Sequence, residues 1–221
     1  MKRFECRAIL FDLDGVLVDS AAYIEEQWRR WAAGRGLPAE PFLRVCHGRR
    51  AVETIRLAAP HLDAEAEVAA FRPEASGNMV TIEPIEGAAR LLEALPAGSW
   101  AVATSGPRED ATDRLCRAGL PSPRVLICAE DVAHGKPHPD VYLHAAASLR
   151  VHPVDCLVIE DAPAGVQAAR AAGMPVIALT TTHSRHELSA DAWTATLASI
   201  QVGYTDAPPG ASRLELLVRD S

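Results

Sequence analysis

From residue 85 onward, short apolar runs alternate with segments of helical periodicity, and this alternation restricts the possible folds more than any other feature of the chain. A parallel sheet covered by helices on both faces produces such a pattern, because each strand must be followed by a crossover. Residues 6–11 supply one more strand, so an α/β fold with a parallel sheet is predicted. The predicted strands are 100–103, 125–128, 156–159 and 176–179, and the predicted helices are 86–95, 107–118, 139–149 and 163–172.

Residues 20–80 break this alternation. Helical pieces are predicted at about 20–33, 39–46, 50–59 and 63–72, with no apolar strand between them. An all-helical insertion after the first strand is therefore expected. Two apolar runs around a Pro-Pro-Gly turn in the tail, 198–221, predict a hairpin on the edge of the sheet.

Bulk composition excludes several classes of protein. The chain has 221 residues, of which 48% are hydrophobic, so it can bury a large core. Its formal net charge of −7 argues against a general nucleic-acid binder. No membrane-length apolar stretch and no signal peptide are found. Five scattered cysteines without framework spacing favour a reducing compartment, and a cytoplasmic protein is expected.

Two carboxylates follow the first predicted strand in the stretch FDLDGVLVDS. Asp12 and Asp14 are two residues apart, so in extended chain they point to the same side. They repel each other unless a cation lies between them or one of them takes a proton. The alternative interpretation is a surface loop with acidic residues and a helix cap.

Polar residues also follow the later strands, where ligands bind on open parallel sheets. They include hydroxyl groups, backbone amides, carboxylates and a lysine. In chain order they are Thr104, Ser105 and Gly106, then Glu130 and Asp131, then Gly135, Lys136 and Pro137, and finally Glu160 and Asp161.

This set of groups is typical of phosphoryl transfer. Mg²⁺ prefers oxygen ligands, and Asp12 and Asp161 are candidate ligands, with Glu160 orienting a bound water. Thr104 and nearby amides at a helix N-terminus are expected to hold phosphate oxygens. Lys136 is one of two lysines against 20 arginines, which suggests that its position needs a compact ammonium, with chance as the alternative interpretation. A carboxylate can then attack phosphorus while a second one moves protons.

Weaker interpretations remain for each element. Thr104 and Ser105 alone are compatible with a capping pair, and Glu160 and Asp161 with an ordinary turn. The histidines at 134 and 138, which flank Lys136, suggest zinc, but further His or Cys at ligand spacing is missing.

Four segments together resemble the haloacid dehalogenase superfamily of phosphotransferases: DLDG at 12–15, ATSG at 103–106, GKPHPD at 135–140 and EDAPAG at 160–165. The resemblance implies a Rossmann-like core, a mobile cap, Mg²⁺ and an aspartyl-phosphate intermediate. It makes Asp12 the nucleophile and a metal ligand. It makes Asp14 the general acid/base, which also offers its backbone carbonyl to the metal. Thr104 and Lys136 would bind phosphate, Asp161 would bind Mg²⁺, and Glu160 would support the metal site.

The cap sequence His47-Gly-Arg-Arg looks most like the sugar-phosphate phosphatases of this superfamily, which include 2-deoxyglucose-6-phosphate and glycerol-phosphate phosphatases. The expected function is therefore a Mg²⁺-dependent phosphatase for small phosphorylated sugars or polyols. A sugar-phosphate mutase of the β-phosphoglucomutase type is the first alternative, although Ile24 stands where such mutases carry a His. A non-catalytic metabolite-binding module is the second, although Asp12, Asp14, Lys136 and Asp161 are all present.

The expected division of the chain is a core of residues 1–18 and 82–221 and a helical cap of residues 19–81. Because the core segments recognise only the phosphoryl group, selection among sugars is assigned to His47, Arg49 and Arg50 in the cap. Ser105 and Gly106 in the core are also expected to bind the substrate. The expected partner is a small phosphorylated metabolite, with no nucleic acid or membrane, and the protein is expected to be a monomer.

Overall fold

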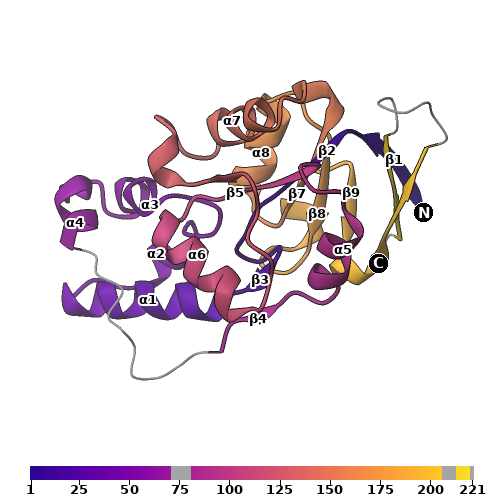
Figure 1. Ribbon diagram of the computed structural model, residues 1–221. Helices are drawn as coiled ribbons and strands as arrows, with labels where there is room; N and C mark the ends of the chain where they lie inside the picture. The colour runs from indigo at the N-terminus through magenta and orange to yellow at the C-terminus, as the bar shows by residue number, and fades with distance from the viewer. Residues whose placement is uncertain (71–80, 206–212, 220–221) are drawn as a thin grey trace.

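The computed structural model describes residues 1–70, 81–205 and 213–219, and a six-stranded parallel sheet organises the chain (Figure 1). The α/β prediction is confirmed. Each predicted strand from residue 100 to 179 forms, and one further strand extends the sheet at its edge. In spatial order the strands are β6 (Leu126–Ile127), β5 (Trp100–Ala103), β2 (Ala8–Phe11), β7 (Cys156–Glu160), β8 (Val176–Leu179) and β9 (Ala192–Thr194).

Helices cover both faces of this sheet because its strands are apolar on both sides. In β2, Ile9 and Phe11 belong to one buried cluster, whereas Ala8 and Leu10 belong to another. The first cluster packs under α5 and α6, and the second packs under α7 and α8. The bounds of these helices are α5 (Ala88–Ala94), α6 (Arg108–Arg117), α7 (Asp140–Leu149) and α8 (Pro163–Ala171).

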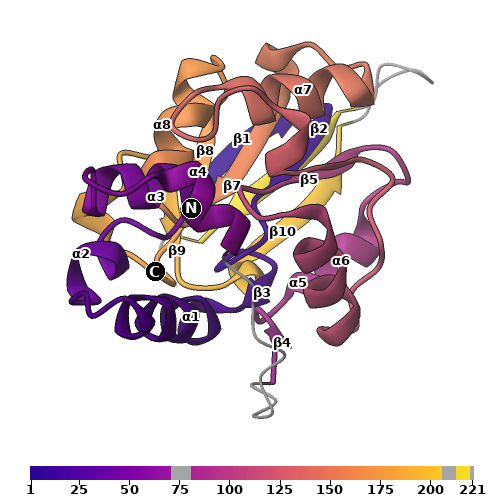
Figure 2. The same ribbon diagram turned by 90° about the vertical axis from the view of Figure 1, so that its left-hand side faces the viewer.

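The helical insertion has an apolar cluster of its own. Trp28 stacks on Phe42 with ring centroids 5.6 Å apart, and Trp31 meets the same ring edge to face at 5.0 Å. Figures 1 and 2 show these helices gathered at one end of the molecule, opposite the chain termini in Figure 1. They are α1 (Ala21–Gly34), α2 (Glu40–Leu43), α3 (Ala51–Ala58) and α4 (Ala64–Ala70). The exact domain boundaries stay a prediction.

A short antiparallel ribbon joins the insertion to the core. It pairs β3 (Val18–Asp19) with β4 (Glu83–Pro84), so the two crossing points of the chain lie side by side. Such two-residue strands have too little apolar pattern to be recognised in the sequence.

The two ends of the chain form a sheet that the sequence did not predict. The first strand was expected over residues 6–11, but it divides into β2 and a separate β1 (Lys2–Cys6). The hairpin of β10 (Ile200–Tyr204) and β11 (Leu214–Val218) forms as expected, but it pairs with β1 in an antiparallel sheet. The expectation that it lies on the edge of the parallel sheet was wrong, because β9 occupies the edge beyond β8. The Pro-Pro-Gly turn lies outside the described residues.

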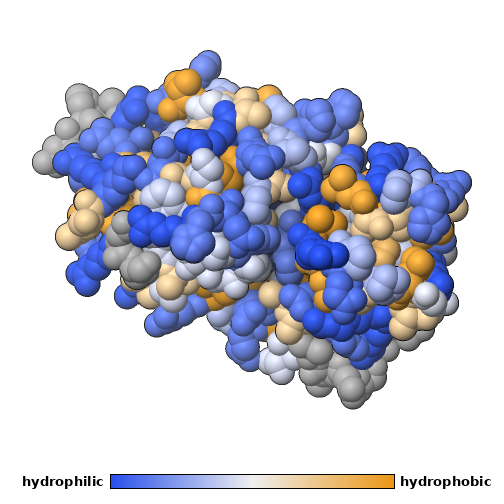
Figure 3. Space-filling view, turned by 180° about the vertical axis from the view of Figure 1, so that it is seen from behind, coloured by the Kyte–Doolittle hydropathy of each residue, from blue (hydrophilic) through white to orange (hydrophobic). Residues whose placement is uncertain are grey.

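The face of the molecule seen in Figure 3 is mainly hydrophilic, with apolar residues scattered among the polar ones. The same view shows a hollow between the larger and the smaller part of the molecule. Within the described ranges, no helix is both long enough and apolar enough to cross a membrane.

Candidate active site

Three neighbouring strands, β5, β2 and β7, bring the predicted site residues to one edge of the sheet. Asp12 directly follows β2, Thr104 directly follows β5, and Glu160 ends β7 with Asp161 after it. Because the strands are parallel, their carboxyl ends meet at the same edge. All four of these side chains are buried. The residues that the sequence rule collected after these strands therefore meet at one edge of the sheet.

Lys136 lies at the centre of this edge and is completely buried. Its Nζ donates to Asp12 Oδ1 at 2.5 Å and to Glu160 Oε1 at 2.7 Å, and the Tyr142 ring centroid is 4.9 Å away. Burial alone would lower the pKa of Lys136, but the carboxylates of Asp12 and Glu160 raise it. The ammonium is therefore held charged beside Asp12.

Glu160 uses both of its oxygens within the protein. Oε1 accepts from Lys136 and from the Tyr142 hydroxyl at 2.9 Å, while Oε2 accepts from the backbone N–H groups of Asp161 and Ala162 at 2.8 and 2.9 Å. Burial raises its pKa, but the pairing with Lys136 outweighs this and lowers it. A Cβ at Gly165 would stand 1.5 Å from Oε1, so α8 must offer a glycine there. Glu160 thus has little free capacity for direct contact with a metal.

Asp161 differs from Glu160 because one of its oxygens has no partner. Oδ2 accepts from the Thr182 hydroxyl, whereas the buried Oδ1 has no hydrogen-bond partner in the described structure. Burial, together with the nearby charges of Glu160 and Asp12, raises the pKa of Asp161 well above its ordinary value. The backbone of Gly15 approaches the Asp161 carboxylate closely: its φ is +79°, and a Cβ added there would stand 2.2 Å from Oδ2.

These carboxylates fit a divalent cation. One oxygen each from Asp12, Glu160 and Asp161 lies within 4.8 Å of the others. Burial, which outweighs the neighbouring Lys136, raises the pKa of Asp12 to about 7. In the described structure, three carboxylates share the single cation Lys136, the pKa values of Asp12 and Asp161 are raised, and Asp161 Oδ1 has no hydrogen-bond partner. A further cation with a preference for hard oxygen ligands, such as Mg²⁺, suits this set of groups.

The histidines that suggested zinc do not add to this cluster. The rings of His134 and His138 lie 4.8 Å apart, and His134 Nδ1 is 3.0 Å from Asp140 Oδ2. Among the described residues, the metal-compatible cluster is the one formed by Asp12, Glu160 and Asp161.

Asp14 has partners different from those of Asp12. Its Oδ1 accepts from the Ser20 hydroxyl at 2.5 Å, and its Oδ2 accepts from Arg114 Nη1 at 2.7 Å. Arg114 comes from α6, which is 100 residues later in the chain. The two aspartates of the first motif are therefore separated by pairing each with its own cation.

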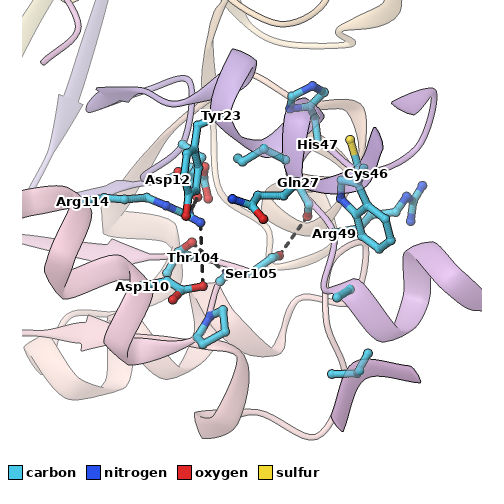
Figure 4. Close-up of a pocket in the computed structure, with 18 of the residues that line it drawn as sticks. Asp12, Tyr23, Gln27, Cys46, His47, Arg49, Thr104, Ser105, Asp110 and Arg114 are labelled. Carbon is cyan, nitrogen blue, oxygen red and sulfur yellow. Dashed lines mark hydrogen bonds and ion pairs between the residues drawn. The ribbon is translucent and has the colours of Figure 1, made fainter. Parts of the chain in front are cut away.

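A cavity of about 300 Å³ opens between these residues and the helical insertion (Figure 4). Its wall thus combines a polar rim from the sheet with mixed polar and aromatic side chains from the helices. The core contributes Asp12, Asp14, Thr104, Ser105, Gly106, Pro107, Glu109, Asp110 and Arg114. The insertion contributes Tyr23, Ile24, Gln27, Trp28, Cys46, His47, Gly48, Arg49, Ala51 and Val68.

The insertion also touches the core directly beside this cavity. Ser105 Oγ donates to the carbonyl of Gly48 at 2.9 Å, and a Cβ at Gly48 would stand 2.7 Å from the Cβ of Ala162. His47 faces His183 of the core, with ring centroids 6.1 Å apart. Ser105 therefore has a contact to the insertion that the sequence did not indicate.

Arg49 and Arg50 point to different places. Arg49 lines the cavity, whereas Arg50 is not among the described lining residues. Arg50 pairs with Glu53, and its guanidinium donates to the carbonyls of Val132 at 3.2 Å and Ala133 at 3.3 Å. This geometry does not support the expected contact of Arg50 with substrate hydroxyls, because the guanidinium is already occupied at the boundary between the insertion and the core.

Residues 6–173 match the protein family described as haloacid dehalogenase-like hydrolase. The chain belongs to the haloacid dehalogenase-like hydrolases. Hexitol phosphatase A from Escherichia coli (strain K12) is 41% identical to this hydrolase over 79% of this chain and 83% of its own length. Glycerol-1-phosphate phosphohydrolase 2 from Saccharomyces cerevisiae (strain ATCC 204508 / S288c) is 37% identical over 79% of this chain and 75% of its own length.

Solved structures agree with the family assignment. The crystal structure of a hydrolase from Pseudomonas syringae superimposes with a TM-score of 0.76 at 27% sequence identity, covering 84% of this chain and 92% of that one. The family resemblance seen in the four motifs is thereby confirmed. This haloacid dehalogenase-like hydrolase is a phosphatase, a phosphoric monoester hydrolase.

Two residues of the site carried a sequence signal that was not used. Thr182 follows β8 in the run Thr180-Thr181-Thr182, so the rule that selected residues after strands also applies to it. Arg114 lies on the buried face of α6 with Ala111 and Leu115, and a charged residue on an apolar helix face signals a buried partner. Its partner could not be identified from spacing.

Proposed function

We propose that this enzyme is a Mg²⁺-dependent phosphatase for small phosphorylated sugars or polyols and that it acts through an aspartyl phosphate on Asp12. The observation that carries the proposal is that Asp12 lines the cavity while a fully buried lysine holds one of its oxygens. The names of the hexitol and glycerol-1-phosphate relatives support polyol phosphates as the substrate class.

In the first step, a carboxylate oxygen of Asp12 attacks phosphorus and the bond to the leaving oxygen breaks. Lys136 keeps the carboxylate oriented and offsets charge on the phosphoryl group. The Thr104 hydroxyl and the amide N–H groups that precede α6 hold the non-bridging oxygens. Asp14, in its protonated form, gives the proton that it took from water in the preceding turnover to the leaving alcohol oxygen, so the alcohol departs neutral.

In the second step, Asp14 takes a proton from a water molecule, and this water attacks the phosphorus of the aspartyl phosphate. The bond between phosphorus and the Asp12 oxygen breaks, inorganic phosphate forms, and the Asp12 carboxylate is restored. The insertion, acting as a cap over the cavity, keeps bulk water out until the alcohol has left.

Asp12 and Asp161 would hold the Mg²⁺ ion through their carboxylates. Glu160 would keep Lys136 and the backbone of Asp161 in place through its hydrogen bonds. The backbone carbonyl of Asp14 remains the further ligand that the family resemblance implies. The ion, when bound, neutralises negative charge on the phosphoryl group and on the carboxylates around it.

A screen of phosphorylated metabolites tests the substrate class. Purified enzyme with Mg²⁺ is expected to release inorganic phosphate from a hexitol, hexose or glycerol phosphate with the highest kcat/KM, and from nucleotides or phosphoproteins poorly. Conversion of a hexose 1-phosphate into its 6-phosphate without phosphate release would instead establish a mutase. Release from none of the small esters would reject the proposal.

Mg²⁺ is expected to stabilise the fold more at high pH than at low pH. Because the folded-state pKa values of Asp12 and Asp161 are raised, their contribution to stability without metal is present at acid pH and is lost as pH rises through about 7 for Asp12. A metal replaces these protons. Thermal unfolding with a few millimolar Mg²⁺ should show a Tm increase of about 3 °C or more near pH 8 and a much smaller one near pH 5.5.

Asp161→Asn serves as the control for this measurement, because it removes a proposed ligand. It should largely abolish the Mg²⁺-dependent increase near pH 8. An equal increase in Tm at both pH values, or one that survives Asp161→Asn, would place the ion elsewhere.

Arg49→Ala and Arg50→Ala are expected to differ in substrate dependence. Arg49 lines the cavity, so its loss should lower kcat/KM for the best sugar or polyol phosphate by about 1–3 kcal/mol and affect p-nitrophenyl phosphate much less. Arg50 links the insertion to the carbonyls of Val132 and Ala133, so its loss should affect both substrates by similar factors. If instead Arg50→Ala lowered kcat/KM selectively for the sugar or polyol phosphate and Arg49→Ala affected both substrates alike, Arg50 would be the residue that selects the substrate.

Further parts of the proposal concern the whole protein. We propose the division into a core of residues 1–18 and 82–221 and a cap of residues 19–81, in line with the separate apolar cluster of the insertion. All five cysteines are free, which agrees with a cytoplasmic enzyme. A monomer is proposed.

A further inference from the structure

Arg114 is a buried arginine whose charge must be compensated inside the protein. Its exposed fraction is 8%, and it lies on the inner face of α6 with Ala111 and Leu115. Placing a guanidinium there is costly unless carboxylates and hydrogen bonds replace the lost water. The contacts that Arg114 makes therefore indicate why α6 carries it.

These contacts converge on Asp14. Arg114 Nη1 donates to Asp14 Oδ2 at 2.7 Å, its Nη2 lies 3.9 Å from Asp110 Oδ2, and the ring of Tyr23 from α1 lies 5.6 Å from the guanidinium carbon (Figure 4). Two carboxylates and an aromatic ring thus surround the guanidinium. Its orientation is fixed from both the core and the insertion.

Ser20 completes the arrangement around Asp14. Ser20 stands at the N-cap position of α1, yet its hydroxyl makes no capping hydrogen bond and donates to Asp14 Oδ1 at 2.5 Å. Both oxygens of the Asp14 carboxylate therefore have a donor, one from the residue before α1 and one from α6. A carboxylate held in this way has one defined position on the cavity wall.

We propose that Arg114 is a positioning residue for Asp14, which fixes this carboxylate where it reaches the leaving oxygen and the hydrolytic water. The inference rests on the proposed role of Asp14 as the group that moves protons. A proton donor contributes most when it is held within hydrogen-bond reach of the reacting oxygen. Arg114 acts through Asp14 and has no proton of its own to transfer.

The leaving group provides a selective measurement. An alkyl phosphate releases an alkoxide unless a proton arrives, so kcat/KM depends on Asp14. The p-nitrophenolate ion leaves without a proton, so kcat/KM for p-nitrophenyl phosphate reports the same phosphate site without this dependence. Damage to folding, metal binding or phosphate binding would lower both values.

The experiment compares Arg114→Met and Arg114→Lys with the matched control Arg117→Met, which lies on the same helix and pairs with Asp113 on the outer face. Arg114→Met should lower kcat/KM for the best alkyl phosphate at least about 10-fold, with p-nitrophenyl phosphate within about 3-fold of the wild type. Arg114→Lys should recover part of the lost kcat/KM for the alkyl phosphate. Lysine keeps a cation beside Asp14 but lacks the planar guanidinium with its fixed set of donors. Arg117→Met should leave kcat/KM unchanged for both substrates.

Asp14→Asn and the double variant complete the test. If Arg114 acts through Asp14, adding Arg114→Met to Asp14→Asn should cost less than about 3-fold more with the alkyl phosphate. If the double variant loses a further factor in kcat/KM as large as that of Arg114→Met alone, Arg114 binds the substrate directly. If Arg114→Met lowers kcat/KM equally for both esters, its role is purely structural. Either result overturns the inference. Asp14→Asn that retains wild-type activity on alkyl phosphates would reject the proposed function itself, whatever Arg114 does.

Discussion

Asp12→Asn is expected to reduce phosphatase activity by at least about 10⁴-fold, or about 5.5 kcal/mol of transition-state stabilisation. The side-chain amide of Asn cannot form the acyl phosphate. Among the described residues, no other carboxylate both accepts a hydrogen bond from Lys136 and lines the cavity. The measurement is release of inorganic phosphate from the best substrate in Mg²⁺. Substrate binding should persist, because the residues that hold the phosphoryl oxygens are unchanged.

The same substitution should leave the fold intact. Burial raises the pKa of Asp12 to about 7, so the site already tolerates a neutral residue there, and Lys136 keeps its contact with Glu160. The Tm is therefore expected to equal or exceed that of the wild type. Asp19→Asn, an exposed aspartate on β3, is the matched control and should be fully active. Near-normal activity of Asp12→Asn would remove the nucleophile assignment.

Lys136→Arg is expected to lower kcat/KM at least about 100-fold, or about 2.7 kcal/mol, although the charge is kept. Lys136 has no exposed surface and bridges Asp12 and Glu160 beneath the ring of Tyr142. A planar guanidinium is larger and presents its donors in a fixed fork, so it must displace one of these partners. The orientation of the Asp12 carboxylate would then be lost.

The other lysine of the chain supplies a matched control. Lys2 lies exposed on β1, and Lys2→Arg should change neither activity nor Tm. Thermal unfolding of Lys136→Arg should show a loss of about 1–3 kcal/mol from overpacking, which is separable from the catalytic loss by assaying well below the Tm. An active Lys136→Arg enzyme would show that charge alone is needed at this position.

The sequence by itself determined the parallel sheet, the helical insertion and the edge at which the site lies. These features depend on local patterns: apolar runs such as 100–103 form strands wherever they are buried, and parallel strands present their carboxyl ends together. Thr104 and Asp161 could be found for this reason. A residue that directly follows a buried strand has a position fixed by the strand itself.

Tertiary structure alone decided which side chains meet across elements. Arg49 and Arg50 are neighbours in the chain just before α3, and Arg50, the N-cap residue of this helix, has extended backbone, so the two side chains point in different directions. Only the docking of α3 on the core sends one to the cavity and the other to Val132 and Ala133. Arg114 meets Asp14 because α6 packs beside β2, a proximity that spacing along the chain does not encode. Buried charges choose partners by distance in three dimensions, and sequence reasoning identifies the charge but not the partner.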